Sequence, residues 1–450
     1  MKKNEELIVE IIDNGISGEG ISKIDGFPIF IPNVIKGEKV KIKIVKVLKS
    51  YAFGKVIEIL KKSDFRIDSD CETYLRCGGC NLRHCNYEST IDMKKNSVQN
   101  TLTKALGRKI EVNEVLRMNT PYFYRNKLQY PVGMDKEGNP VMGVYAERSH
   151  LIIPTTECKI QDKRCQKIAN YIFNSIKENG IPVYNEITLK GCIRHIIIRI
   201  GKKTNEVMVT LVTNTAKIPK ESELVSAITS KFNEVKTIAK NINNKNTNVI
   251  LGDKTEILFG EGYIYDYLGN KKFKISPMSF YQVNPIQTEK LYSKAIEYAE
   301  LSGKETIFDL YCGIGTIGIF ASDNVKKIYG IETIPEAIED AKENAKINGI
   351  QNSEFFIGNV EEVLPELIKE RSLSADVVFI DPPRKGCDKV AIDTILNIMP
   401  KRLVYVSCNP ATLGRDLKLL EEKYELKKLA ICDMFCFTSH IESIAVLKLK

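Results

Sequence analysis

Near the start of the chain, apolar and polar side chains alternate in short runs that glycines interrupt. Residues 39–44 read Lys-Val-Lys-Ile-Lys-Ile, so the apolar side chains share one face of a strand and the lysines the other. Short alternating strands between glycine turns are typical of a small antiparallel β-barrel. We therefore predict an OB-like barrel with a basic stripe over residues 1–62, although an edge strand kept soluble by lysines has the same pattern.

The middle of the chain, residues 63–274, combines one helical pattern with several strand patterns. Residues 86–106 are polar with helical periodicity, which predicts an exposed helix. Residues 193–200 and 206–212 are mostly apolar and are separated by a polar turn, which predicts paired antiparallel strands. The asparagine-rich residues 241–248 fit a surface loop. This part is predicted to be an antiparallel-rich α+β domain.

From residue 275 to residue 450, strand patterns alternate with helical patterns. The predicted strands are residues 306–310, 328–331, 377–380, 403–406, 431–437 and 444–449. Helical patterns at residues 315–321 and 335–348 lie between the first of them. Such alternation predicts a doubly wound, mainly parallel, Rossmann-like sheet. The chain as a whole is thus expected to be a multidomain α/β protein.

Length, composition and charge agree with this division. The chain has 450 residues, whereas a single core rarely exceeds roughly 250–300 residues. The sequence contains neither an apolar run long enough to span a membrane nor the apolar core of a signal peptide, so we expect a cytoplasmic protein and a monomer. The net charge of +9 suggests an anionic partner such as RNA, but the surface of an ordinary protein from a lysine-rich organism has similar charge.

A glycine-rich turn follows the first predicted strand of the C-terminal domain, in the string IFDLYCGIGTIG at residues 307–318. Glycines at the carboxyl end of a strand let the backbone approach a ligand in the crevice where such sheets bind nucleotides. The next strand ends at Glu332, an acid placed to hydrogen-bond a ribose diol. A dinucleotide would also suit this spacing, but the third glycine of an NAD site is missing.

Three further polar side chains are predicted at strand ends of the same domain. Asp381, in the string DPPR, ends the strand at residues 377–380, and Cys408, in SCNPATL, follows the strand at residues 403–406. Glu442, in SHIES, lies between the last two predicted strands. The carboxyl ends of parallel strands meet at one edge of a sheet, which predicts that the thiol and the carboxyl groups share the ligand crevice.

The N-terminal half contains a group of closely spaced cysteines. The spacing C-x5-C-x2-C places them at Cys71, Cys77 and Cys80, and Cys158 lies downstream. Cysteines in a chain without a secretory signal favour metal binding or catalysis over a disulfide framework. Four thiolates bind either a [4Fe-4S] cluster or zinc, and the spacing does not decide between them. Cys85 and Cys165 are alternative fourth ligands.

Taken in order, these motifs resemble one known family. The strings C-x5-C-x2-C, SFYQVN, DLYCGIGT, DPPR, SCNPATL and HIE follow an N-terminal segment that resembles a TRAM domain. The series resembles the RNA uracil-5-methyltransferases that modify 23S ribosomal RNA, over nearly the whole chain. The resemblance implies a TRAM RNA-binding barrel at residues 1–62, a central domain with an iron-sulfur cluster at residues 63–274, and a class I methyltransferase domain at residues 275–450.

The resemblance also implies ligands. S-adenosylmethionine would contact the motif residues Gln282, Tyr311, Gly313, Glu332 and Asp381. A structural [4Fe-4S] cluster would be held by Cys71, Cys77, Cys80 and Cys158. The family usually has an aspartate in a later Gly-Asp segment, where this chain has Asn359. The aromatic residue Phe280 is a candidate for stacking on a flipped base.

The implied reaction explains why a thiol and a carboxylate are needed together. Carbon 5 of uracil is too weak a nucleophile to attack a sulfonium methyl group directly. When the Cys408 thiolate adds to carbon 6, carbon 5 becomes nucleophilic, and a base, here Glu442, must then remove the carbon-5 proton so that the thiolate can leave. Asp381 would hold the uracil edge.

Four alternatives share part of the pattern. Radical methylthiotransferases combine a TRAM barrel with a cluster, but they use C-x3-C-x2-C. Cytosine-5-methyltransferases carry a Pro-Cys motif, whereas this chain has Pro382-Pro383 after Asp381. A non-enzymatic RNA-binding protein would not need Cys408 with Glu442. A transfer-RNA uracil-5-methyltransferase is the closest rival, although its simpler members often lack the barrel and the cluster.

Overall fold

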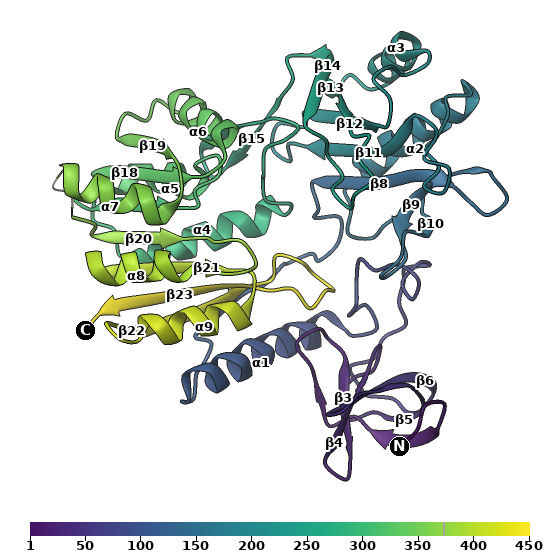
Figure 1. Ribbon diagram of the computed structural model, residues 1–450, viewed down its shortest axis with the longest axis horizontal. Coiled ribbons are helices and arrows are strands. Elements are labelled where there is room, and N and C mark those ends of the chain that lie inside the picture. Colours follow the sequence, from purple (N-terminus) through teal and green to yellow (C-terminus); the bar gives the residue numbers. More distant parts are fainter. Residues whose placement is uncertain (372–373) are drawn as a thin grey trace.

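The N-terminal segment folds into the predicted small β-barrel-like unit. The computed structural model describes residues 1–371 and 374–450 (Figure 1). The first sheet has the order β1-β5-β6-β4-β3-β2, formed by β1 (Glu6–Glu10), β2 (Asp13–Asn14), β3 (Gly20–Ile24), β4 (Phe27–Ile31), β5 (Lys39–Val47) and β6 (Ala52–Lys61). Along β5, Val40, Ile42 and Ile44 are fully buried and the intervening lysines are not, so the predicted alternation is confirmed.

The central part is built on a seven-stranded sheet with the order β10-β9-β8-β11-β12-β13-β14. Its strands are β8 (Lys127–Met134), β9 (Pro140–Tyr145), β10 (Ile152–Pro154), β11 (Ile193–Ile200), β12 (Val207–Thr213), β13 (Val235–Ile242) and β14 (Lys254–Gly260). Only the β12–β13 pair is parallel, as an antiparallel-rich domain requires. The predicted loop at residues 241–248 begins two residues late, because β13 continues to Ile242.

Two helices, α2 (Lys163–Glu178) and α3 (Glu221–Lys231), pack on one face of this sheet (Figure 1). In β8 and β11, Leu128 stands opposite Ile198 and Tyr130 opposite Ile196, and these side chains join the core beneath the helices. Strand residues alternate between the two faces. Lys127, Gln129 and the side chains opposite them therefore point to the other face.

The C-terminal part is an eight-stranded sheet with the order β19-β18-β17-β20-β21-β23-β22-β7. Its strands are β7 (Glu114–Leu116), β17 (Thr306–Leu310), β18 (Lys327–Glu332), β19 (Ser353–Ile357), β20 (Val377–Ile380), β21 (Arg402–Ser407), β22 (Tyr424–Cys432) and β23 (Glu442–Leu449). The run from β19 to β21 is parallel, and β23 is antiparallel to its neighbours β21 and β22. The predicted doubly wound sheet is confirmed.

Helices cover both faces of this sheet (Figure 1). One core contains side chains of α4 (Pro285–Ala299), α5 (Thr316–Ala321), α6 (Pro335–Ile347) and the hairpin β15 (Ile264–Leu268) and β16 (Lys271–Ile275). The other contains side chains of α1 (Tyr87–Leu106), α7 (Val360–Arg371), α8 (Lys389–Ile398) and α9 (Pro410–Leu420). A short 3-10 helix, η1 (Ser322–Asn324), follows α5.

Helix α1 is not the exposed helix that its polarity predicts. Val98 and Leu102 are fully buried, and the helix packs along α9 (Figure 1). The approach is close, because a side chain at Gly414 of α9 would meet the Cβ of Ala105 at 2.7 Å. Downstream, β7 pairs with β22 in parallel. Residues 87–116 thus join the C-terminal sheet although the central sheet follows them in the chain.

The predicted strand at residues 431–437 is wrong. Strand β22 ends at Cys432, and residues 433–441 form a loop that leads into β23. The backbone of Phe437 has a left-handed φ of 61°, which a continuous strand does not allow. In the part of the chain that the structure describes, no helix is both long and apolar enough to cross a membrane.

Candidate active site and cysteine cavity

The three predicted catalytic side chains come together at one edge of the C-terminal sheet. Asp381 follows β20 and Cys408 follows β21, and these parallel strands end at the same edge. Strand β23 runs the opposite way, so Glu442, its first residue, starts where they end, with Ser443 paired to Ser407. The arrangement follows directly from strand order and direction.

The Cys408 thiol is half-buried and surrounded by charged groups of both signs. Burial, followed by the nearby Glu442 and Asp381 carboxyl groups, raises the pKa of Cys408 to about 11, while Arg384 acts in the opposite direction. The thiol is therefore neutral at neutral pH in the protein alone. A thiolate forms when positive charge is added or a carboxyl group accepts the proton.

The two carboxyl groups are also shifted toward their neutral forms. Burial, followed by the charge of Asp381, raises the pKa of Glu442 well above its usual range, and Arg384 opposes the shift. Burial raises the pKa of Asp381 to about 7. Acids with raised pKa values can both hold and release protons near neutral pH, which is the property needed for general acid–base chemistry.

The glycine-rich turn after β17 forms an open cradle. Tyr311, Gly313 and Gly315 all have left-handed φ values, of 64°, 54° and 78°. The backbone N–H of Gly313 donates to Glu332 Oε2 at 3.2 Å, so the ends of β17 and β18 are tied together. A Cβ added at Gly313 would meet no atom within 4 Å. The turn therefore leaves space for a ligand beside the Glu332 carboxylate. Oε1 of this carboxylate already accepts from Thr333 and Ile334, so Oε2 is the oxygen with a lone pair left for a hydroxyl group.

Gln282 reaches the same region from the segment before α4. Its side chain is hydrogen-bonded to the Tyr292 hydroxyl, which lies 3.4 Å from Thr316 Oγ1 at the start of α5. The carbonyl of Gln282 accepts a hydrogen bond from Asn126 Nδ2 at 3.1 Å. Phe280 is 71% exposed, so its ring is available for stacking.

Two residues at this edge were quoted in the motifs but given no role by the sequence analysis. Asp309 is fully buried; its Oδ2 accepts from Gly318 N at 2.8 Å, and its Oδ1 has no partner among the described residues. Burial raises its pKa to about 7. Arg384 is the cation that opposes the pKa shifts of both Cys408 and Glu442. The sequence feature that indicates a role for Arg384 is its position directly after Asp-Pro-Pro.

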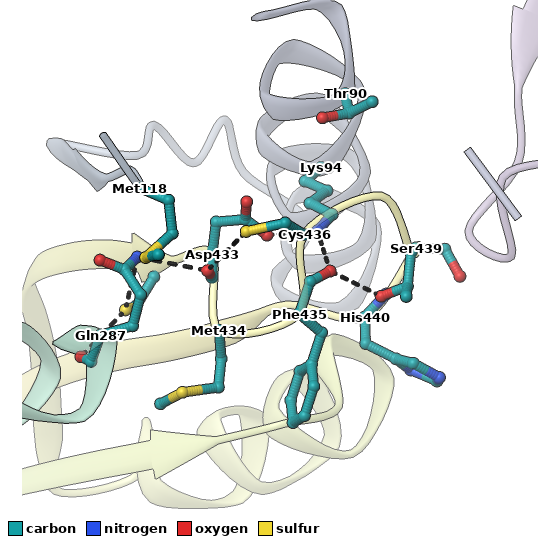
Figure 2. A network of polar contacts seen from close by, with 12 residues as sticks. Thr90, Lys94, Met118, Gln287, Asp433, Met434, Phe435, Cys436, Ser439 and His440 are labelled. Atoms are coloured by element: carbon teal, nitrogen blue, oxygen red, sulfur yellow. Dashed lines mark hydrogen bonds and ion pairs between the residues drawn. The ribbon is translucent and has the colours of Figure 1, made fainter. Parts of the chain in front are cut away.

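The loop that carries the chain into Glu442 is anchored by helix α1 (Figure 2). Lys94 forms a buried ion pair with Asp433, and its Nζ also donates to Phe435 O at 3.0 Å. Gln287 Nε2 donates to Asp433 O at 3.2 Å. In Figure 2, the Phe435 and His440 side chains point away from Lys94. The buried lysine of α1 thus fixes the start of the loop.

The cysteine-containing segment holds the other end of the same loop. The backbone N–H of Ser439 donates to Asn81 Oδ1 at 2.8 Å, and that of Leu82 donates to Phe437 O at 3.0 Å. The Arg83 guanidinium lies 4.5 Å from the centre of the Phe437 ring. Residues 81–83 directly follow Cys80, so the cysteine region and the active-site loop are in direct contact.

The four cysteines chosen from the resemblance line a single cavity of about 320 Å³, which is bordered by Cys71, Cys77, Cys80 and Cys158. Cys85 and Cys165 do not line it, and Cys165 belongs to the apolar core of the central sheet. Burial, followed by the charge of Cys158, raises the pKa of Cys80 to about 12. Among the described residues, no three histidine, cysteine or acidic side chains are placed to hold a metal ion.

Comparison with known proteins places these features in context. The family model described as tRNA (Uracil-5-)-methyltransferase matches residues 224–450, and the TRAM domain model matches residues 2–57. An uncharacterized RNA methyltransferase of Clostridium acetobutylicum is 50% identical over 453 aligned residues, which cover 100% of this chain and 98% of that protein. One from Staphylococcus aureus is 44% identical and covers 100% and 99%.

A solved structure has a similar fold over almost the whole length. The tRNA (uracil-54, C5)-methyltransferase of Pyrococcus abyssi, solved in complex with S-adenosyl-L-homocysteine, is 26% identical and superposes with a TM-score of 0.79. The match covers 98% of this chain and 100% of that one. It therefore includes the N-terminal barrel and the central sheet as well as the C-terminal sheet.

Proposed function

Since this chain belongs to the RNA (uracil-5-)-methyltransferase family and carries a TRAM domain, we propose that it methylates carbon 5 of specific uridines in 23S ribosomal RNA with S-adenosylmethionine as methyl donor. The observation that carries the proposal is the convergence of Cys408, Glu442 and Asp381 at one sheet edge, each within the electrostatic influence of another. A thiol paired with a high-pKa carboxyl group is what this chemistry requires.

The residues beside this edge fit S-adenosylmethionine, which supplies an electrophilic methyl group when it is bound. Glu332 would accept hydrogen bonds from the ribose hydroxyls, and the open turn at Gly313 would let the backbone approach the cofactor. Tyr311, Gln282 and Asp381 would border it. Asp309 Oδ1, buried without a partner among the described residues, would gain one through a water or the cofactor.

The first step is the addition of Cys408 to the uracil ring. The thiol loses its proton to solvent, the Sγ–C6 bond forms, and the electrons of the C5–C6 double bond move toward the carbonyl oxygen at C4. Arg384 favours this step, because its positive charge partly opposes the rise in the pKa of the thiol. Carbon 5, now nucleophilic, would take the methyl group as the bond between that group and the sulfonium sulfur of the methyl donor breaks.

The second step returns the enzyme to its starting state. Glu442 removes the proton from carbon 5, the C5–C6 double bond re-forms, and the Sγ–C6 bond breaks to release Cys408 as a thiolate. The thiolate then regains a proton, and Glu442 passes its proton to solvent. A carboxylate that is buried beside another acid is a stronger base than one in water, which suits removal of a carbon-bound proton.

For the cysteine cavity, we propose a structural [4Fe-4S] cluster held by Cys71, Cys77, Cys80 and Cys158. The support is that four thiols from two distant segments border one cavity, which Arg83 and Arg125 also line. These cations complement the negative charge of a thiolate-bound cluster.

Metal analysis tests the cluster separately from activity. Protein purified without oxygen should be brown and contain about four iron atoms per chain, and Cys158→Ala should lose both the colour and the iron. The matched variant Cys165→Ala should keep them, because Cys165 lies outside the cavity. Stoichiometric zinc without iron would overturn the assignment.

The RNA substrate has one rival. The Pyrococcus abyssi protein is named for transfer RNA and matches 98% of this chain, so the barrel does not by itself separate ribosomal from transfer RNA substrates. The order of motifs favours 23S ribosomal RNA. The test is to measure methyl transfer from labelled S-adenosylmethionine to unmodified 23S ribosomal RNA and to transfer RNA, followed by nucleoside analysis. We expect 5-methyluridine in the ribosomal RNA. Label only in transfer RNA would select the rival.

A further inference from the structure

The cavity beside the four cysteines extends onto the open face of the central sheet, where the proposed mechanism assigns no role. Lys127 and Gln129 of β8, Tyr145 of β9 and His195 of β11 line this end. His195 stands opposite Pro131, two residues beyond Gln129, so these side chains share the face that lies away from α2 and α3. We call Lys127, Gln129, Tyr145 and His195 the sheet end of the cavity.

Hydrogen-bonding groups in the sheet end lack partners. His195 is only 6% exposed, yet neither of its ring nitrogens has a hydrogen-bond partner among the described residues. The Gln129 side chain forms no hydrogen bond with any residue that the structure describes. Buried polar groups are nearly always paired, so the unpaired ring of His195, which faces a cavity, indicates a missing ligand.

The sheet end also has uncompensated positive charge. Lys127 and Arg125 line the cavity, and Arg199, opposite Lys127 on β11, is almost fully buried. Within the described residues, none of the three forms an ion pair. Burial, followed by Arg199 and then Arg125, lowers the pKa of Lys127 to about 8. Charges held together without an acidic partner are unfavourable until an anion binds.

We propose that the sheet end binds one nucleotide of the substrate RNA, distinct from the uridine that is methylated. Lys127 would bind its phosphate, and Gln129 and His195 would hydrogen-bond the edge of its base. The inference rests on the proposed function, since it names a further subsite for the same substrate.

The sheet end is directly connected to the active site. Val283 lines the cavity, and the neighbouring Gln282 belongs to the proposed cofactor site. Asn126, between Arg125 and Lys127, donates to the carbonyls of both Gln282 and Val283. A nucleotide bound here would therefore fix the position of the RNA strand relative to the segment that borders the cofactor, and so determine which uridine reaches Cys408.

Steady-state kinetics with 23S ribosomal RNA test the charge contact. Lys127→Met should raise KM for RNA about tenfold with kcat unchanged. The slope of log Kd for this RNA against log salt concentration should fall by about 0.7, because one phosphate contact is lost. Iron content and affinity for S-adenosylmethionine should stay at the parent values. The control Lys231→Met, at the end of α3 on the covered side of the sheet, should match the parent in every readout.

Two uncharged variants separate binding from structure. His195→Leu and Gln129→Leu should each raise KM several-fold while the melting temperature stays the same or rises, because an unpaired polar group is removed. A fall in melting temperature with the parent KM would mean a structural role and would overturn the proposal. If His195→Leu does not fold, the KM and melting temperature of Gln129→Leu decide between binding and structure, because Gln129 is only half-buried.

The outcomes distinguish this proposal from the proposed function. If the parent protein forms no 5-methyluridine in any RNA, the proposed function fails. If the parent forms it and all three variants keep the parent KM and salt slope, only the nucleotide site fails. If Lys127→Met loses iron and its KM returns to the parent value when the cluster is rebuilt, the lysine supports the cluster and does not bind RNA. That result would overturn the proposal.

Discussion

Two groups of cysteine thiols lie in contrasting settings, one at the edge of the C-terminal sheet and one around the central cavity. Cys408 stands alone, half-buried, with carboxyl groups and one arginine as its charged neighbours. The four cavity cysteines face one another, and each of Cys77, Cys80 and Cys158 has its pKa raised by burial and by other cysteines.

The difference teaches that neighbours, and not the thiol itself, set the chemistry. A single thiol next to a base and a cation can be deprotonated, attack carbon and leave again. Thiols that converge on one cavity oppose each other's ionisation unless a metal centre compensates their charge. Contact between the active-site loop and residues 81–83 links the two settings physically.

Replacement of Cys408 is the strongest test of this difference between the two groups of thiols. Cys408→Ala should lower methyl transfer by at least roughly 10⁴-fold, because no other group can activate carbon 5. Binding of S-adenosylmethionine, measured by calorimetry, should not change. Cys192→Ala is the matched control, since Cys192 is buried in the central core away from both settings, and it should retain parent activity. Substantial activity in Cys408→Ala would refute the mechanism.

At Glu442, the second step can be separated from the first. Glu442→Gln should reduce turnover by about 10²–10⁴-fold and accumulate an RNA-linked protein, because addition proceeds while proton removal is blocked. A denaturing gel detects the slow-migrating species. The absence of such a species, under conditions in which the parent turns over, would count against Glu442 as the base.

Removal of Lys94 tests whether helix α1 supports the active-site loop. Lys94→Met leaves Asp433 buried without its partner, so the free energy of unfolding should fall by about 3–5 kcal/mol. Turnover should fall as well, because the loop leads into Glu442. Lys104→Met, on the exposed side of the same helix, should change stability by less than about 0.5 kcal/mol.

The double variant Lys94→Met with Asp433→Leu refines this test. Replacing both charges with apolar groups should recover most of the lost stability, since no buried charge is left unpaired. If the double variant is as unstable as Lys94→Met, the ion pair is not the origin of the effect.

The smallest expected effect is a shift in the pH dependence of kcat/KM when Arg384 is replaced. Cys408 acts as a thiolate and Glu442 as a carboxylate, and both pKa values are raised, so kcat/KM should increase with pH toward the Cys408 pKa of about 11. Arg384→Gln should raise both pKa values further, lower kcat/KM about tenfold at pH 8 and recover at higher pH. Lys385→Gln should leave the profile unchanged.

Much of the site could be predicted because it depends on strand ends. The fully apolar run at residues 377–380 is β20 with its predicted bounds, and strand direction alone places Asp381 and Cys408 at one edge. The sequence also predicts that the chain turns sharply at Gly313, where a left-handed φ is found.

What could not be predicted depends on contacts between distant segments. Polar α1 becomes half-buried because Lys94 pairs with Asp433, more than three hundred residues later in the chain. The apolar character of residues 431–437 indicates a strand, but the backbone of Asp433 and Phe435 is paired instead with Gln287 and Lys94. Periodicity reports local preference and does not include such partners.

The most direct test of the central claim is to trap the covalent step. With 5-fluorouridine in place of uridine in 23S ribosomal RNA, addition and methylation proceed but Glu442 finds no proton to remove from carbon 5. Digestion and mass spectrometry should then find a methylated 5-fluorouridine nucleotide attached to the peptide that contains Cys408. An adduct on another residue, or none at all under conditions in which the parent protein forms 5-methyluridine in ordinary RNA, would contradict the account.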